Sequence, residues 1–207
     1  MKMIQTKLLN KKVGLYYGSF NPIHIGHLVV ARKALDDTDL DEVWFVVSPQ
    51  NPHKQNTGEL IEADHRLAMV DIAIKGISDF KSCDVEFGLP QPSYTHIGLR
   101  VLRDRHPDTE FSIIGGSDLQ RKMSIWKSHK EILEYHKLII YPRILSGKDL
   151  KYKEADEFIE SNTIHLENVP KLEISATYIR EHLKKGKSVQ WLISDNVIKY
   201  IKENKLY

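Results

Sequence analysis

Two short segments near opposite ends of the chain carry side chains suited to binding phosphate. Residues 18–27 read Gly-Ser-Phe-Asn-Pro-Ile-His-Ile-Gly-His, and residues 174–180 read Ile-Ser-Ala-Thr-Tyr-Ile-Arg. Together they supply imidazoles, hydroxyls and a guanidinium, with no obvious nucleophile. We therefore expect the two segments to form one nucleoside triphosphate site, which holds and polarises phosphate without attacking it.

The first segment has the sequence context of a phosphate-binding turn. It follows the apolar run 13–17 and leads into the amphipathic stretch 27–36, which predicts a strand, a tight turn and the start of a helix. Backbone N–H groups and the helix dipole favour phosphate at such a place. His24 and His27 are spaced to face the same side, and Gly26 leaves room for phosphate to approach the backbone. The alternative is a pair of histidines that only pack at a turn.

The second segment adds donors at another expected helix start. Arg180 lies one turn beyond the hydroxyls of Ser175 and Thr177, and its forked guanidinium suits the β- and γ-phosphates. The hydroxyls are equally suited to capping the helix, which is compatible with phosphate binding because both use the same helix end. For Arg180 the alternative is a solvated surface arginine.

The size and composition of the chain predict one domain over residues 1–207. The net charge of +2 favours neither presence nor absence of a polyanionic partner, and we expect no nucleic-acid partner. No apolar run predicts a membrane span or a signal peptide, so we expect no membrane contact and a cytoplasmic setting. Whether the chain forms a homo-oligomer stays open. Cys83 is the single cysteine, and we expect a packed thiol there.

Apolar strands alternate with helical patterns along most of the chain. This order predicts an α/β fold with a doubly wound, mostly parallel, Rossmann-like sheet, helices on both faces and a helical C-terminus. Asp64, His65 and Arg66 read only as a helix start with Asp64 as the cap, and the charged stretch 146–160 reads as a surface excursion with one helix. The expected strands are 13–17, 42–48, 80–87, 110–115, 137–141 and 162–166, and the expected helices are 27–36, 64–75, 93–105, 128–136, 174–185 and 194–203.

Three polar loops follow expected strands, after Tyr17, Ser48 and Gly115. In a doubly wound sheet, ligands bind at the carboxyl ends of the strands, so we expect these loops to form the site. The loop 49–58 is long, polar and rich in Pro and Gly. We expect it to be poorly ordered without ligand and to close over a substrate.

The two phosphate-binding segments resemble the histidine signature and the C-terminal Ile-Ser-x-Thr-x-x-Arg element of the nucleotidylyltransferase superfamily. Three further elements resemble the bacterial nicotinate-nucleotide adenylyltransferases: the Pro-His-Lys loop at 49–54, Ser-Tyr-Thr at 93–95, and Gly-Gly-Ser-Asp at 115–118 with the downstream Trp126. The match spans essentially the whole chain. Asn21 stands where many members have Asp, and Asn51 where a proline often stands; neither removes a charged catalytic group.

The resemblance implies transfer of AMP from ATP to nicotinate mononucleotide, with release of pyrophosphate. Mg²⁺ would be carried by ATP and pyrophosphate, without dedicated protein ligands. The attacking group is already a phosphate oxyanion, so the protein needs no general base and must only align an in-line displacement and neutralise charge. The implied catalytic residues are His24, His27 and Arg180. The implied ATP-binding residues are Gly18, Ser19, Phe20, His24, His27, Gly115, Asp118, Ser175, Thr177 and Arg180.

The acceptor-binding residues implied by the resemblance are Ser19, His53, Lys54, Thr95 and Trp126. Lys54 suits the mononucleotide phosphate, Trp126 offers a flat face to a pyridine ring, and Thr95 can donate to the nicotinate carboxylate. Asp118 suits the ribose hydroxyls. The alternatives are a solvated loop lysine and a tryptophan in the core.

Three other functions compete with this interpretation. His-Ile-Gly-His also occurs in class I aminoacyl-tRNA synthetases, but the chain has no room for an anticodon-binding domain, and Lys122 lies before further elements of the sheet. Adenylyl or cytidylyl transfer to another phosphomonoester, such as phosphopantetheine, is a closer rival, although those relatives lack the Ser-Tyr-Thr and Trp126 elements. A non-catalytic nucleotide-binding regulator would be expected to have lost His24, His27, Thr177 or Arg180.

Overall fold

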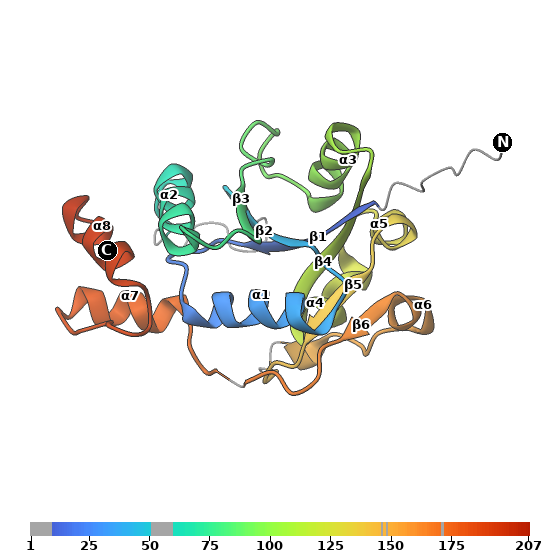
Figure 1. Ribbon diagram of the computed structural model, residues 1–207. Coiled ribbons are helices and arrows are strands. Elements are labelled where there is room, and N and C mark those ends of the chain that lie inside the picture. Colours follow the sequence, from blue (N-terminus) through green and yellow to red (C-terminus); the bar gives the residue numbers. More distant parts are fainter. Residues whose placement is uncertain (1–9, 51–59, 146, 148, 171) are drawn as a thin grey trace.

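The computed structural model describes residues 10–50, 60–145, 147, 149–170 and 172–207. Its centre is one parallel β-sheet (Figure 1). Its strands are β1 (Lys11–Gly18), β2 (Glu42–Val47), β3 (Phe80–Cys83), β4 (Thr109–Gly116), β5 (Leu138–Tyr141) and β6 (Thr163–His165). Their order is β3-β2-β1-β4-β5-β6, and all neighbouring pairs are parallel. The order reverses between β1 and β4, which is the switch point of a doubly wound sheet. The predicted fold class is confirmed.

Helices cover both faces of this sheet (Figure 1). They are α1 (Ile25–Asp37), α2 (Ala63–Ile74), α3 (Thr95–Arg105), α4 (Ser117–Lys122), α5 (His129–Tyr135), α6 (Glu157–Ser161), α7 (Ala176–Lys184) and α8 (Asp195–Glu203), with 3-10 turns η2 (Met123–Ile125) and η3 (Asp149–Lys151). One core cluster joins α1, α2, α7 and α8 to the sheet, and a second joins α3, α5 and α6 to it. The expected helical C-terminus is present, and α8 packs against α2.

The strands are apolar on both faces because both faces are covered. In β1, Val13 and Leu15 belong to one core cluster, whereas Tyr16 belongs to the other. All three are buried. This alternation explains why the central strands read as continuous apolar runs in the sequence.

Two predicted boundaries were wrong. The first helix begins at Ile25, with His24 at its N-cap, and not at position 27. The strand expected over 80–87 ends at Cys83, because the N–H of Phe87 donates to the carbonyl of Asp84 (2.8 Å) and the chain turns there. These are local hydrogen bonds that the apolar pattern does not reveal.

The segment 115–118, expected as a loop, is the junction of a strand and a helix. β4 continues through Gly116, and α4 begins directly at Ser117. A Cβ on Gly115 would lie 2.5 Å from Cδ1 of Leu119, so glycine lets α4 fold back onto the strand end. The cap predicted for α2 was also wrong, because Glu62 and not Asp64 holds its N-cap position.

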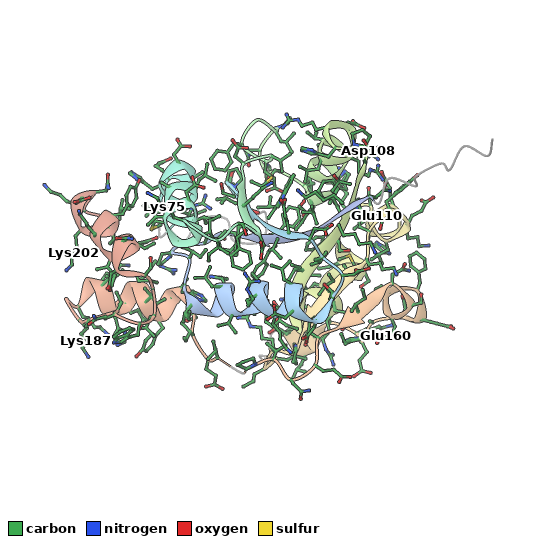
Figure 2. The ribbon with its side chains drawn as sticks, viewed as in Figure 1. Lys75, Asp108, Glu110, Glu160, Lys187 and Lys202 are labelled. Atoms are coloured by element: carbon green, nitrogen blue, oxygen red, sulfur yellow. The ribbon has the colours of Figure 1, made fainter. Side chains whose placement is uncertain are left out.

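Charged side chains project outward around the periphery, as Lys75, Glu160 and Lys202 illustrate (Figure 2). Both signs are mixed there, in keeping with the small net charge. None of the helices in the described ranges is long and apolar enough to cross a membrane.

Candidate active site

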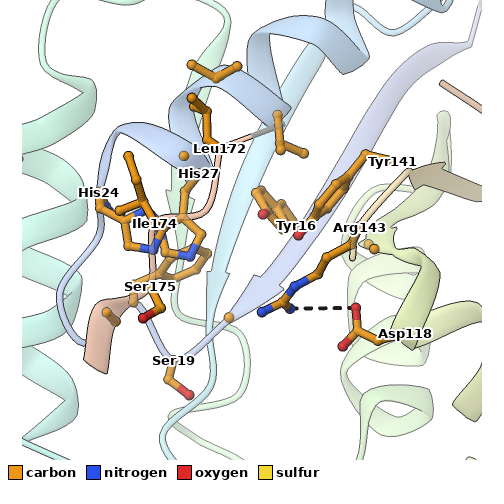
Figure 3. Close-up of a pocket in the computed structure, with 18 of the residues that line it drawn as sticks. Tyr16, Ser19, His24, His27, Asp118, Tyr141, Arg143, Leu172, Ile174 and Ser175 are labelled. Atoms are coloured by element: carbon orange, nitrogen blue, oxygen red, sulfur yellow. Dashed lines mark hydrogen bonds and ion pairs between the residues drawn. The ribbon is translucent and has the colours of Figure 1, made fainter. Parts of the chain in front are cut away.

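A cavity of about 990 Å³ opens at the carboxyl ends of β1, β4 and β5 (Figure 3). Small-molecule sites usually measure about 300–1,000 Å³, so the cavity is large enough for a nucleotide. Every residue expected to bind ATP lines it: Gly18, Ser19, Phe20, His24, His27, Gly115, Asp118, Ser175, Thr177 and Arg180. The fold therefore brings the two segments from opposite ends of the sequence together.

The two histidines form a stacked pair at the start of α1. Their ring centroids are 3.7 Å apart, with 27° between the ring planes. The backbone N–H of His24 donates to Nδ1 of His27 (3.2 Å). Because that nitrogen accepts a hydrogen bond, the neutral His27 ring carries its proton on Nε2. The N-cap geometry thus fixes the tautomer of His27 as well as its position.

His24 is uncharged at neutral pH. Its side chain is buried, and burial, followed by the positive charge of Arg143, lowers its pKa to about 4. Among the described residues, nothing hydrogen-bonds to its buried Nδ1. A Cβ on Gly26 would lie 3.1 Å from this nitrogen, so Gly26 leaves room for the His24 ring as well as for a ligand. His24 can therefore act as a neutral hydrogen-bonding group.

The lowered pKa of His24 predicts a loss of stability in acid. An unfolded histidine binds its proton near its ordinary pKa of 6.5, whereas folded His24 stays neutral down to about 4. Between these values the unfolded state binds more protons, so the free energy of unfolding falls as the pH falls, by up to about 3 kcal/mol for this group. Urea denaturation from pH 7 to pH 4 should show a smaller fall for His24→Asn than for the wild-type chain. Equal pH dependence in both would contradict the assignment.

Arg66 holds the turn that carries the first segment. It is completely buried, and its guanidinium donates to the carbonyls of Ser19 (2.7 Å), Ser48 (2.7 Å), Pro49 (2.8 Å) and Ile61 (3.0 Å). Burial lowers its pKa to about 10, so it remains a cation at neutral pH. The interpretation of Arg66 as only a helix start was wrong: it ties the end of β1 to the end of β2.

Phe20 adds a local constraint to the same turn. It adopts a left-handed backbone conformation, with φ of 44°, and its buried ring lies beneath Gly18. A Cβ on Gly18 would lie 2.8 Å from that ring, so a larger residue would displace the turn.

Arg180 joins the second segment to the first. Its guanidinium donates to the backbone carbonyl of Asn21 (2.9 Å) and to Oγ1 of Thr177 (3.2 Å). Ser175 is the N-cap of α7, where its hydroxyl accepts from the N–H of Tyr178 (3.2 Å). The capping role expected for Ser175 is confirmed. Contact between Arg180 and phosphate stays a prediction.

Asn21 also receives a contact from the last residue of the sequence. The hydroxyl of Tyr207 donates to Oδ1 of Asn21 (2.7 Å). The side chain that departs from the family pattern is therefore part of the hydrogen bonding that holds the turn before His24.

Asp118 and Arg143 stand opposite the histidines, as Figure 3 shows. Asp118 lies in the first turn of α4, and its Oδ1 lies 3.6 Å from Nη1 of Arg143. Sequence reasoning missed Arg143, although it follows the expected strand 137–141. The same strand-end rule that selected Asp118 also selects Arg143.

Of the residues expected to bind the acceptor, only some can be compared with this cavity, and these do not all line it. Ser19 lines it, whereas Thr95 and Trp126 are not among its lining residues. Those two lie in neighbouring segments, since Nζ of Lys127 is 4.7 Å from the ring centroid of Tyr94. His53 and Lys54, with most of the loop 49–58, lie outside the described residues.

The remaining candidate groups are the thiol of Cys83 and side chains that could hold a metal ion. Burial raises the pKa of Cys83 to about 11, so its thiol is protonated at neutral pH, and it packs against the second core cluster as expected. Within the described ranges, no group of three or more His, Cys, Asp or Glu side chains is placed to hold a metal ion.

The chain matches known proteins over most of its length. A family model described as cytidylyltransferase-like matches residues 15–182. A probable nicotinate-nucleotide adenylyltransferase of Cytophaga hutchinsonii is 44% identical over 197 residues, covering 95% of this chain and 98% of that relative. The probable nicotinate-nucleotide adenylyltransferase of Bacteroides thetaiotaomicron is 39% identical over 203 residues, covering 98% of this chain and 96% of that relative. The chain belongs to the nicotinate-nucleotide adenylyltransferase family.

A solved structure of the same kind supports the family's fold. Plasmodium falciparum nicotinic acid mononucleotide adenylyltransferase complexed with NaAD matches with a TM-score of 0.71 and 25% identity, covering 95% of this chain and 97% of that chain. The resemblance seen in the motifs is therefore confirmed at the level of the whole chain.

Proposed function

We propose that the chain transfers AMP from ATP to nicotinate mononucleotide, forming nicotinate adenine dinucleotide and pyrophosphate for NAD biosynthesis. The observation that carries this proposal is the assembly of both phosphate-binding segments around one cavity, joined by the hydrogen bond from Arg180 to Asn21. Family membership and the curated relatives support it.

The chemistry needs donors and alignment, and it needs no base. The phosphate oxyanion of the acceptor attacks the α-phosphorus of ATP in line, and pyrophosphate leaves. In this proposal His24 and His27 donate to the triphosphate, and Arg180 supplies positive charge beside them. The low pKa of His24, the hydrogen bond that His27 accepts at Nδ1 and the position of all three residues on the cavity wall support these roles. Preorganised donors of this kind stabilise charge that develops on the transferring and leaving phosphates.

We propose that magnesium enters as part of the substrate, carried by ATP and leaving with pyrophosphate. Its charge would offset the negative charge of the phosphates. The residues of the chain would then bind the metal-bearing triphosphate through its oxygens.

The acceptor side of the proposal rests on the family resemblance. Lys54 and His53 would contact the mononucleotide phosphate, Thr95 the nicotinate carboxylate and Trp126 the pyridine ring. Ser19 would contribute where the acceptor meets ATP, since it lines the cavity.

A panel of acceptors tests the function. With ATP and Mg²⁺, we expect pyrophosphate release with nicotinate mononucleotide, and a kcat/KM roughly 100-fold lower with the nicotinamide mononucleotide, because one desolvated charged contact distinguishes them. Equal kcat/KM for the two mononucleotides would remove the predicted preference. Faster reaction with phosphopantetheine would establish the rival transfer, and no pyrophosphate with any acceptor would favour a non-catalytic regulator.

A further inference from the structure

The charged side chains that line the cavity differ in their exposure and in their hydrogen-bond partners. Among the described lining residues the cations are Arg143 and Arg180, and the anions are Asp118 and Glu173. Arg180 is only 9% exposed and donates to the carbonyl of Asn21 and the hydroxyl of Thr177. The side chain of Arg143 is 55% exposed. Of the two cations among the described lining residues, Arg143 is therefore the one whose side chain is exposed to an entering polyanion.

The backbone of Arg143 is anchored while its side chain spans open space. Its N–H donates to Oγ of Ser117 (3.3 Å), and the same hydroxyl donates to the carbonyl of Tyr141 (3.4 Å). These bonds fix the segment after β5 against the start of α4. Figure 3 shows the guanidinium extending from this anchor into the cavity, on the side facing Asp118.

The glycine at the end of β4 makes this arrangement possible. A Cβ on Gly116 would lie 2.6 Å from Oδ1 of Asp118 and 3.4 Å from Cδ of Arg143. Glycine therefore lets both side chains pass over the strand end.

The ion pair of Arg143 is of a kind that exchanges easily. Nη1 of Arg143 and Oδ1 of Asp118 are 3.6 Å apart, and both groups reach solvent. Such exposed pairs contribute little stability, whereas charge-assisted hydrogen bonds from a guanidinium to phosphate are strong and often bidentate. Asp118 would keep a cation nearby if Arg143 left it, because Nζ of Lys122 lies 3.8 Å from its Oδ2.

The positive charge of Arg143 acts electrostatically on residues of the expected triphosphate site. It contributes to lowering the pKa of His24, and it also lowers the pKa of Tyr16, which burial raises more strongly. Both residues line the cavity. The guanidinium and the histidine pair thus act on the same space from opposite sides.

We propose that Arg143 is a further catalytic residue, which exchanges its ion pair with Asp118 for oxygens of the ATP triphosphate. This inference rests on the proposed function. Arg143 binds the triphosphate in the ground state and stabilises the charge on pyrophosphate as it leaves. Asp118, released from Arg143, is then available to the ribose hydroxyls.

Kinetics of Arg143→Gln and Arg143→Lys test this role, with Arg32→Gln as the matched control. Arg32 is also an exposed, ion-paired arginine, but it does not line the cavity. At saturating nicotinate mononucleotide, Arg143→Gln should lower kcat/KM for ATP by about 10- to 100-fold, the loss expected for one or two charge-assisted hydrogen bonds. The KM for nicotinate mononucleotide should change by no more than about twofold. Arg143→Lys should retain part of the activity, because lysine keeps the charge without the fork, and Arg32→Gln should match the wild-type chain.

Equilibrium binding separates this inference from the proposed function. Arg143→Gln should weaken the binding of ATP by about tenfold and leave the affinity for AMP unchanged, whichever acceptor the enzyme uses. An unchanged affinity and kcat/KM for ATP would overturn the proposal. A rise confined to the KM for nicotinate mononucleotide would also overturn it, by placing Arg143 on the acceptor phosphate. Urea midpoints of the variants should equal that of the wild-type chain.

Discussion

Replacing His24 or His27 by alanine is expected to lower kcat about 100-fold or more, because each change removes one oriented donor to the transferring or leaving phosphate. The two rings are stacked at the N-terminus of α1, and both line the cavity. Steady-state kinetics with ATP and nicotinate mononucleotide measure the effect. The thermal midpoints of the variants should remain close to that of the wild-type chain.

His65→Ala is the matched control for this comparison. His65 lies on α2, where its Nδ1 hydrogen-bonds with the hydroxyl of Tyr200 (2.9 Å), and it does not line the cavity. Its replacement should leave kcat unchanged. A cavity histidine variant that melts like the wild-type chain and keeps near-normal turnover would show that the pair is structural.

Arg66→Met is expected to be the most destabilising single change considered, with a loss of at least about 3 kcal/mol in the free energy of unfolding. The substitution removes the donor from four partly buried carbonyls, and an unsatisfied carbonyl that water does not reach costs about 1–3 kcal/mol. Such a loss is a large part of the about 5–15 kcal/mol that stabilises a typical domain. Urea denaturation measures it directly.

Two further variants make the Arg66 result interpretable. Arg66→Lys keeps the positive charge with fewer, unforked donors, so its stability should be intermediate. Arg32→Met removes an exposed arginine and should cost no more than about 1 kcal/mol. If Arg66→Met were no more costly than Arg32→Met, the carbonyl contacts would not stabilise the turn.

The fold class follows from the sequence because alternation of strands and helices is a pattern along the chain. The order of the strands in the sheet does not follow from that pattern, because it depends on the side of the sheet on which each crossover helix lies. Val85 and Phe87 alternate with polar residues and so extended the expected third strand, yet the turn at Asp84 ends it. The helix α4 escaped prediction because its six residues after β4 are too few to show helical periodicity.

The candidate ATP site was predictable for a different reason. Parallel strands end at one edge, so residues after β1 and β4 had to meet there, and the helix starting after residue 175 completes the site. Arg66 could not be found in this way, because its acceptors are backbone carbonyls and leave no trace in residue types. Arg143 could have been predicted as a site residue, because it follows β5 and therefore lies at the same edge of the sheet.

Transfer of the α-phosphorus is the most direct test of the proposed reaction. ATP labelled at the α-phosphorus is incubated with the chain, Mg²⁺ and nicotinate mononucleotide, and the products are separated. We expect the label to enter nicotinate adenine dinucleotide in equal amount to the pyrophosphate released, with none bound to the protein. Label that appears only in AMP or ADP, or that remains attached to the protein, would contradict direct adenylyl transfer.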